Sequence, residues 1–196
     1  MASDRHSALA ASAGPAGLPV VRLAPRCATP YRAFMLQAYA AHPDAFTSSA
    51  SERAALPLAW WEERLSSAAC ARELVLAVRD GEHLLGVAGL AFETREKTAH
   101  KCTLFGMYVH PAHRSAGIGH RLVLAALDAA RARPGVQLVQ LSVTAGNHGA
   151  EALYRRCGFI PFGREPQAVA VASGFVDKVH MWCALDTPGG QATDHG

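Results

Sequence analysis

The residues best suited to chemistry lie in one short segment, Arg114-Ser115-Ala116-Gly117-Ile118-Gly119, here called the glycine loop. It follows a strand-like apolar run, 104–109, and opens an amphipathic segment with helical spacing. Because Gly117 and Gly119 lack Cβ atoms, the backbone can turn tightly and bring successive N–H groups up to phosphate oxygens. The N-terminus of a helix also carries unpartnered N–H groups and a partial positive charge, so the loop is expected to bind an anion such as a pyrophosphate. Arg114 adds a charge and a forked donor.

Two other nucleotide-binding motifs do not fit this segment. A phosphate loop of the NTPase type ends in Gly-Lys-Ser/Thr, whereas Gly119 is followed by His120 and Arg121. A dinucleotide-binding fold needs a third small residue, where this chain has Leu122, and an acidic ribose ligand about 20 residues further on. The region 133–145 has no such acidic residue. A glycine-rich turn that binds nothing is the remaining structural alternative.

A second group of residues follows the glycine loop. An apolar run, 138–143, has the composition of a strand, and Asn147 opens a short helical segment. The helix and its end carry Ala150, Leu153, Tyr154 and then Cys157-Gly158-Phe159.

Taken together, the two groups resemble the GNAT superfamily of acyl-CoA-dependent N-acetyltransferases. The resemblance runs from Met107 through Phe162 in one continuous order. Residues 107–114 match the family's strand, its Val-x-Pro turn and the start of its Arg-x-x-Gly-x-Gly loop, and the later Asn, Ala, Tyr and Gly-Phe succession is typical of the same family. The resemblance implies an enzyme that uses acetyl-CoA as a co-substrate and no metal, by direct attack of an amine without a covalent acyl-enzyme.

The resemblance also implies which residues bind the cofactor. The strand 107–109 and the strand 141–143 would splay apart, with the pantetheine lying between them, and an N–H near Met107 or Tyr108 would polarise the thioester carbonyl. The implied cofactor-binding residues are Met107, Tyr108, Val109, Arg114, Ser115, Ala116, Gly117, Ile118, Gly119 and Asn147. Asn147 could hold a pantetheine amide, cap its helix, or do both.

Tyr154 is the residue that the resemblance implies as the general acid for the departing thiolate, because a phenol can donate a proton or hydrogen bond to sulfur. Core packing alone would also explain a Tyr four residues after Ala150. The general base is left open among Glu93, His100 and His180, since the strand before the loop reads Lys-Cys-Thr-Leu, where many relatives have a Glu.

Three other groups of residues received a structural interpretation. His110 and His113 have no clustered third ligand, so a metal site is not expected. Cys157 has no identifiable His and Asp partners, so a buried helix-end cysteine is expected instead of a nucleophile. Acceptor specificity is expected from the segments 41–61 and 168–176. Phe46, Trp60 and Trp61 could line an apolar cleft or dock on the core, and Asp177 could hold an ammonium group or be solvated.

Composition favours a single globular domain. Half of the 196 residues are hydrophobic, and the formal net charge is only +3, without a run of like charge. A chain of this length buries enough surface to fold without metal or disulfides. We expect one domain over residues 18–186, with disordered tails at 1–17 and 187–196 that have few large apolar side chains.

Neither nucleic acid nor a membrane is expected as a partner. The basic residues are spread along the chain, and no apolar stretch approaches the roughly 18 residues of a membrane span. The residues at the N-terminus lack the pattern of a signal peptide. Five scattered cysteines without C-x-x-C spacing indicate reduced thiols in the cytoplasm.

The hydrophobic pattern predicts an α/β (mixed α+β) fold, with a mixed central sheet flanked by helices. The expected order, β-α-α-β-β-β-α-β-α-β-β, is also that of the GNAT fold. The expected strands are 20–23, 73–78, 84–92, 102–109, 138–143, 160–164 and 176–185. The expected helices are 31–41, 57–67, 118–133 and the segment opened by Asn147.

The leading hypothesis is an N-acetyltransferase acting on the primary amine of a small molecule. The alternatives are acetylation of a protein N-terminus or lysine, and a catalytically silent acyl-CoA sensor or interaction module. The resemblance also implies that a homodimer could form through the last strands.

Overall fold

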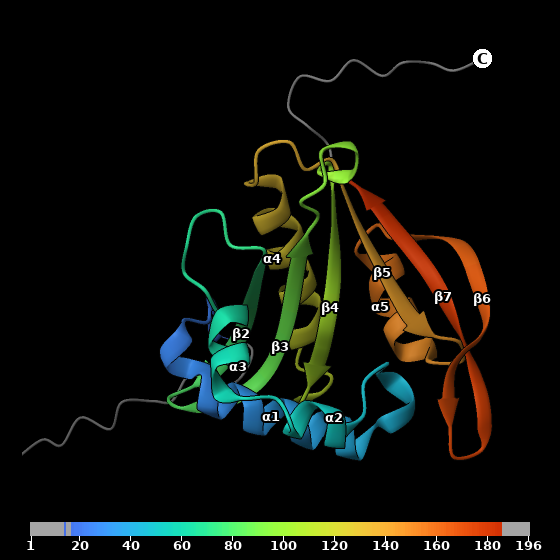
Figure 1. Cartoon of the computed structure of the whole chain (residues 1–196), viewed down its shortest axis with the longest axis horizontal. Coiled ribbons are helices and arrows are strands. Elements are labelled where there is room, and N and C mark those ends of the chain that lie inside the picture. The colour runs from blue at the N-terminus through green and yellow to red at the C-terminus, as the bar shows by residue number, and fades with distance from the viewer. Residues whose placement is uncertain (1–13, 15–16, 186–196) are drawn as a thin grey trace, which may run out of the picture.

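The computed structural model describes residue 14 and residues 17–185 (Figure 1). The strands are β1 (Val20–Arg22), β2 (Glu73–Asp80), β3 (His83–Phe92), β4 (Lys101–Val109), β5 (Leu138–Thr144), β6 (Ile160–Val171) and β7 (Gly174–Ala184). The helices are α1 (Ala28–Ala41), α2 (Ala50–Ala54), α3 (Leu58–Arg64), α4 (Ile118–Arg131) and α5 (His148–Arg156). Of the expected tails, only Gly14 and Gly17 fall among the described residues, and 187–196 lies outside them.

All these strands form one sheet in the order β1-β2-β3-β4-β5-β7-β6. Neighbouring strands are antiparallel except β4 and β5, which are parallel. The long α4 is the crossover that a parallel pair requires. The mixed sheet flanked by helices confirms the fold predicted from the hydrophobic pattern.

Helices cover both faces of the sheet and form two separate cores. Behind the sheet as viewed in Figure 1, the apolar stripe of α4 and the buried residues of α5 pack against alternate residues of β2–β5 and β7. In front, α1 and α3 pack against β2, β3 and Tyr108 of β4. Successive side chains of β4, β5 and β7 point to opposite faces of the sheet. Those that point to the rear are buried under α4 and α5, and those that point to the front are outside that core. Among the described residues, no helix is long and apolar enough to span a membrane.

The N-terminal half departs from expectation in one added helix. α2 begins after Ser49, whose hydroxyl accepts from the Glu52 N–H, while the Glu52 carboxylate accepts from the Ser49 N–H. This capping box stabilises a very short helix that lacks any apolar stripe. The spacing Ser-x-x-Glu is the feature of the sequence that could have predicted the start of this helix. The helix expected to begin at Pro57 begins one residue later, and Pro57 is the N-cap of α3.

The C-terminal hairpin is longer than expected. β6 runs to Val171, beyond the expected end at residue 164, and pairs with β7 across a register shift between Glu165 and Val169. Gln167 lies within this irregularity at φ 51°. The segment 168–176, expected to help select the acceptor, is therefore mainly the end of this hairpin.

A bulge bends β4 in its middle. The register against β3 shifts between Val87 and Gly89, and Gly106 adopts φ +58°, a conformation that favours glycine. Next to the bulge, the Phe105 ring lies over Gly89, where a Cβ atom would come within 2.4 Å of the ring. The Arg64 guanidinium stacks on the same ring, 4.5 Å from its centroid, and forms an ion pair with Glu73 of β2. These contacts hold the C-terminal end of α3 to the sheet.

This close approach makes Gly89 a test of the packing. We expect Gly89→Ala to lower the free energy of unfolding by about 1–3 kcal/mol, because the Phe105 ring must move and its stack with Arg64 must open. Urea denaturation would measure the change. Gly163→Ala is the matched control, since a Cβ atom at this strand glycine would meet nothing within 4 Å. Equal stability of Gly89→Ala and the wild type would contradict the packing described.

Candidate functional site

The sheet opens between its two parallel strands. β4 and β5 pair only at Lys101 with Leu138, Cys102 with Val139 and Thr103 with Gln140. Beyond these pairs the strands separate, although β4 remains paired with β3 as far as Val109 and β5 with β7 as far as Thr144 (Figure 1). The facing edges of both strands therefore leave backbone N–H and C=O groups without a neighbouring strand.

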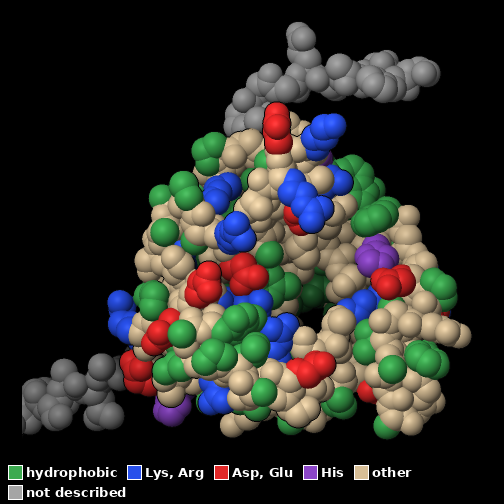
Figure 2. Space-filling model, viewed as in Figure 1, with side chains coloured by type: hydrophobic (Ala, Val, Ile, Leu, Met, Phe, Trp, Pro, Cys, Tyr) green, Lys and Arg blue, Asp and Glu red, His purple; other side chains and the backbone are tan. Residues whose placement is uncertain are grey.

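A cleft of about 820 Å³ occupies this opening and continues to both faces of the sheet. At the rear it is lined by the glycine loop and by α5, and at the front by His42, Ala45 and Phe46 from the end of α1 and its connection to α2. β4 from Leu104 onward and Ser142 and Val143 of β5 form its sides. Figure 2 shows the molecule hollowed on its front face, between the helices and the C-terminal hairpin.

The glycine loop has the geometry of an anion-binding helix start. α4 begins at Ile118, and its N-cap Gly117 has φ 74° and no capping side chain. The Arg121 N–H donates to the Gly117 carbonyl at 3.1 Å, so the N–H groups of the preceding helical residues are the ones left without an intrahelical acceptor. Ser115 also has a positive φ, 65°. These N–H groups and the helix dipole make the rear of the cleft electropositive.

The two glycines of the loop serve different purposes. A Cβ atom at Gly117 would meet nothing within 4 Å, so this residue is needed for its positive φ and leaves open space beside the loop. A Cβ atom at Gly119 would lie 3.1 Å from Leu153 of α5 and 3.2 Å from Met107 of β4. Gly119 therefore allows α4, α5 and β4 to meet closely behind the cleft.

Arg114 links the loop to the front of the cleft. Its Nε–H donates to the Val109 carbonyl at 3.3 Å, and its Nη2 lies 3.0 Å from Nε2 of His42. Because a guanidinium is only a donor, Nε2 of His42 accepts this hydrogen bond. The His42 ring also lies against Tyr108, with 5.7 Å between ring centroids.

α5 brings Asn147 and Tyr154 to the cleft. Asn147 Oδ1 accepts from the Ala150 N–H at 3.2 Å, so this side chain caps the helix. Tyr154 is 7% exposed and lies edge-on to Phe159. Burial is the main cause that raises the pKa of Tyr154 above its usual value, and the nearby Cys157 adds to the rise. The phenol is therefore protonated at neutral pH and can act as a donor.

Of the residues predicted to form the site, all but one line this cleft. They are Met107, Tyr108, Val109, Arg114, Ser115, Gly117, Ile118, Gly119, Asn147 and Tyr154. Ala116 does not; its side chain packs against the rear core. Their roles toward a ligand stay predictions.

Of the other residues considered for acceptor specificity, Phe46 lines the cleft, whereas the two tryptophans and Asp177 do not. Trp61 is fully buried in the front core, edge-on to Tyr31, and Trp60 is stacked between Arg53 and Arg64. Asp177 is an ion-pair partner of Arg164 and accepts from the Gln167 N–H. That backbone hydrogen bond, followed by Arg164, lowers the pKa of Asp177.

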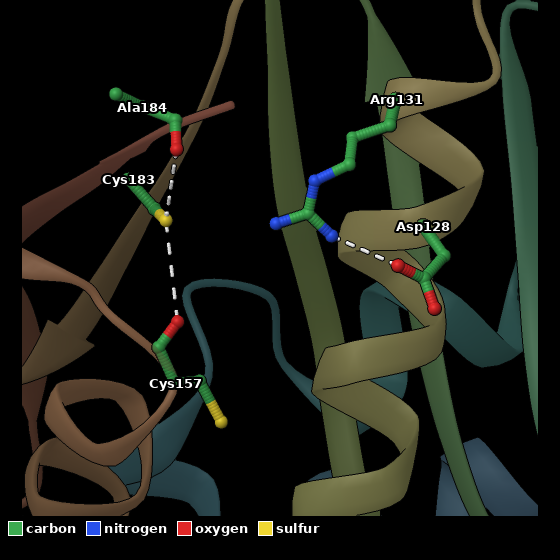
Figure 3. A network of polar contacts seen from close by, with 5 residues as sticks. All are labelled: Asp128, Arg131, Cys157, Cys183 and Ala184. Atoms are coloured by element: carbon green, nitrogen blue, oxygen red, sulfur yellow. Dashed lines mark hydrogen bonds and ion pairs between the residues drawn. The ribbon is translucent and has the colours of Figure 1, made fainter. Parts of the chain in front are cut away.

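Cys157 and the histidine pair have structural surroundings. Figure 3 shows the Cys157 thiol pointing away from Cys183, whose own thiol donates to the carbonyls of Cys157 and Ala184 at 4.0 and 3.4 Å. Burial raises the pKa of the Cys157 thiol. Nδ1 of His110 accepts from the Ala112 N–H. Within the described part of the chain, no group of three or more His, Cys, Asp or Glu side chains could hold a metal ion.

Sequence reasoning did not find the contacts that hold the α1–α2 connection over the cleft. The Thr144 hydroxyl donates to the Asp44 carbonyl at 2.8 Å, and the Lys178 ammonium group donates to the Thr47 hydroxyl. Lys178 is 9% exposed, and desolvation lowers its pKa, partly offset by Glu165. A lysine in a strand carries no sequence signal for such burial.

The matching family model is that of the acetyltransferase (GNAT) family, over residues 35–159. No curated protein matches the chain. A GNAT-family acetyltransferase from Streptococcus pneumoniae superposes with a TM-score of 0.77 at 21% identity, over 86% of this chain and 99% of that one. The yncA protein from Salmonella typhimurium, solved with its cofactor acetyl-CoA, gives 0.69 at 19% identity, over 91% and 99%. A ribosomal-protein-alanine N-acetyltransferase from Brucella melitensis gives 0.67 at 23%, over 86% and 100%. At these identities the likeness concerns the fold.

The buried Lys178 predicts a pH dependence of stability. Its folded-state pKa lies below the unfolded value of about 10.4, so the unfolded chain binds more protons between these two values and stability rises with pH there. We expect Lys178→Met to remove this rise, as measured by chemical denaturation from about pH 8 to about pH 10.5. The same substitution at the exposed Lys97 should leave it unchanged. A wild type whose stability shows no such rise relative to Lys178→Met would contradict the burial.

Proposed function

Because the chain belongs to the acetyltransferase (GNAT) family and is thus an acetyl-CoA-dependent N-acetyltransferase, we propose that its acceptor is the primary amine of a small molecule. The observation that carries this proposal is the cleft that passes between β4 and β5, with the glycine loop at its rear and a partly closed opening at its front. One side suits a nucleotide-bearing thioester, and the other suits a compact amine.

The rear of the cleft fits the co-substrate chemically. The pyrophosphate would be held by the N–H groups of the glycine loop and by Arg114, and the open space beside Gly117 leaves room for it. The pantetheine amides would bond to the free backbone edges of β4 and β5, in the manner of an added strand. Asn147 already uses its carbonyl oxygen as a cap, so its amide N–H remains as the donor toward a ligand.

Two groups of this chain would promote the transfer. The backbone N–H at Met107 or Tyr108, beside the Gly106 bulge, would stabilise the oxyanion that forms on the thioester carbonyl. The hydroxyl of Tyr154 would protonate the thiolate as the C–S bond breaks, which its raised pKa supports by keeping the phenol protonated.

The front opening favours a small acceptor over a peptide. The bonds from Thr144 to Asp44 and from Lys178 to Thr47 join the α1–α2 connection to β5 and β7 across one end of the opening. An extended peptide that runs through the opening would need both ends open, whereas a small amine does not. The alternative acceptor, a protein N-terminus or lysine, would have to enter from the end that these two bonds leave open.

The cellular setting and assembly are part of the same proposal. All five cysteines are thiols in the structure, and the exposed Cys70 supports a reducing compartment, the cytoplasm. β6 ends the sheet as an exposed strand with Ile160 and Phe162 more than half exposed, which supports pairing of two chains as a homodimer.

Cofactor binding gives the first test. We expect the wild type to bind acetyl-CoA with a Kd in the micromolar range by isothermal calorimetry, about −8 kcal/mol. Gly117→Trp should lose this binding, because the indole fills the space beside the loop. The matched control is Gly135→Trp, which also has a positive φ and open space but lies outside the cleft lining. Equal loss in both variants would point to folding, and binding retained by Gly117→Trp would place the cofactor elsewhere.

Turnover gives the second test. We expect coenzyme A release, measured by free thiol, to depend on a small amine, and a peptide with a free N-terminus to give at most a small fraction of that rate. Tyr154→Phe should lower kcat about 100-fold with little change in the Kd for acetyl-CoA. Tyr39→Phe, which removes a hydroxyl from the front core, is the control. Tight binding without turnover for every amine would instead support an acyl-CoA sensor.

A further inference from the structure

The proposed reaction requires a base, and this inference rests on that function. A lysine-like amine has a pKa of about 10.4 and is protonated at neutral pH, so it must lose a proton before it can attack. The candidates Glu93 and His100 lie at the closed end of β4. The Glu93 N–H donates to the Lys101 carbonyl, and the His100 carbonyl accepts from Gln137 and Leu138. Neither lines the cleft.

The histidines that do line the cleft are also poorly suited. His113 lies directly before the glycine loop and His120 lies in the first turn of α4, on the rear face where the phosphates are expected. His42 lies at the front, but its Nε2 accepts from Arg114. In a neutral imidazole the other nitrogen then carries the hydrogen, so His42 has no free lone pair for a substrate amine.

His180 of β7 has the opposite arrangement. Its Nε2 lies 2.9 Å from Oε2 of Glu165 on β6. Because a carboxylate is only an acceptor, Nε2 carries the hydrogen, and the lone pair of the neutral ring is on Nδ1. We propose that His180 is the general base of the acetyl transfer and that Glu165 is the positioning residue that fixes its tautomer.

The fold places His180 on the acceptor face of the sheet. Val179 and Met181 point into the rear core, so His180 faces the front, and β7 pairs it directly with Ser142 of β5. Side chains of such a pair lie about 4.5–5.5 Å apart at their Cβ atoms. Ser142 is exposed and lines the cleft. His180 is not itself in the cleft lining, but unlike Glu93 and His100 it pairs with a residue that is, so a base here would act on the amine through a water molecule.

Few charged groups face His180. Glu165 is its ion-pair partner, and Lys178, two residues earlier on the same face, is bonded to Thr47. From β5 the facing residue is the uncharged Ser142, and the turn Pro43–Ala45, which contacts β5 and β6, brings Asp44. The His180 side chain is 35% exposed, so its proton can be passed to solvent.

The proton balance is complete with these groups. The ammonium gives one proton through the water to Nδ1 of His180, and His180 releases it to solvent. The amine nitrogen forms a bond to the carbonyl carbon, and the C–S bond breaks with its electron pair on sulfur. Sulfur takes a proton from Tyr154. The second proton leaves the nitrogen as the intermediate collapses and restores the Tyr154 hydroxyl through solvent.

The test is the pH profile of kcat/KM for acetyl-CoA and the best small amine, with wild type, His180→Gln and Glu165→Gln. We expect His180→Gln to lower kcat/KM about 100-fold and to lose the fall in rate on the acid side, while the Kd for acetyl-CoA is unchanged. Glu165→Gln should lower kcat/KM less than His180→Gln does, because the amide oxygen can still accept from Nε2 but the side chain no longer requires Nε2 to carry the hydrogen. His180→Ala should be rescued by added imidazole in proportion to its free base. His83→Gln, at the exposed first residue of β3, is the control.

Each other outcome overturns the proposal. An active wild type with an equally active His180→Gln would exclude His180 as the base while leaving the acetyltransferase intact. If His180→Gln lowered kcat/KM but kept its fall at low pH, and imidazole did not rescue His180→Ala, the role of His180 would be structural only. If only His42→Gln lost the fall of kcat/KM at low pH, His42 and not His180 would be the general base. A wild type without turnover for any amine would overturn the proposed function, and the base with it.

Discussion

The site depends on the limited pairing between β4 and β5. Two parallel strands that have joined for three residue pairs would ordinarily continue, because each further pair satisfies buried backbone groups. Here each strand is bonded along its outer edge to an antiparallel neighbour, β3 or β7, so the inner edges can separate without breaking the sheet. The bulge at Gly106 bends β4 away at that place. The resulting unpaired edges are a binding surface made of backbone.

Packing behind the sheet keeps this opening from collapsing. α4 and α5 are buried against the rear faces of both separated strands, and their close meeting at Gly119 brings the helix start to the rear of the cleft. This close meeting requires Gly119, whereas Gly117 is needed for its positive φ, so the loop has two glycines for two different reasons, one steric and one conformational. The proposed anion binding and the observed core packing thus involve adjacent residues of one turn.

The sequence allowed the rear half of the site to be predicted far better than the front half. The glycine loop, Asn147 and Tyr154 are local features, because a turn, a helix cap and a helix face are each set by residues close in the chain. Ala116 was included by position within the motif, yet its side chain packs into the core. The front depends on contacts such as Thr47 with Lys178, 131 residues apart, which have no local pattern. The pairing of His180 with Glu165 likewise depends on the register of β6 against β7.

The strand order has a consequence for how the chain is made. β7 is the last strand in sequence, yet it lies between β5 and β6 in the sheet, and it carries Lys178 and His180, which bond to Thr47 and Glu165. During synthesis, the first four strands and α4 can be completed before β7 has left the ribosome, whereas the acceptor side cannot. A prematurely ended chain that lacks β7 would therefore leave the edge of β5 unpaired. The bond of Thr47 to Lys178 joins residues 131 apart, so the acceptor side of the sheet can be completed only after the last strand has been made.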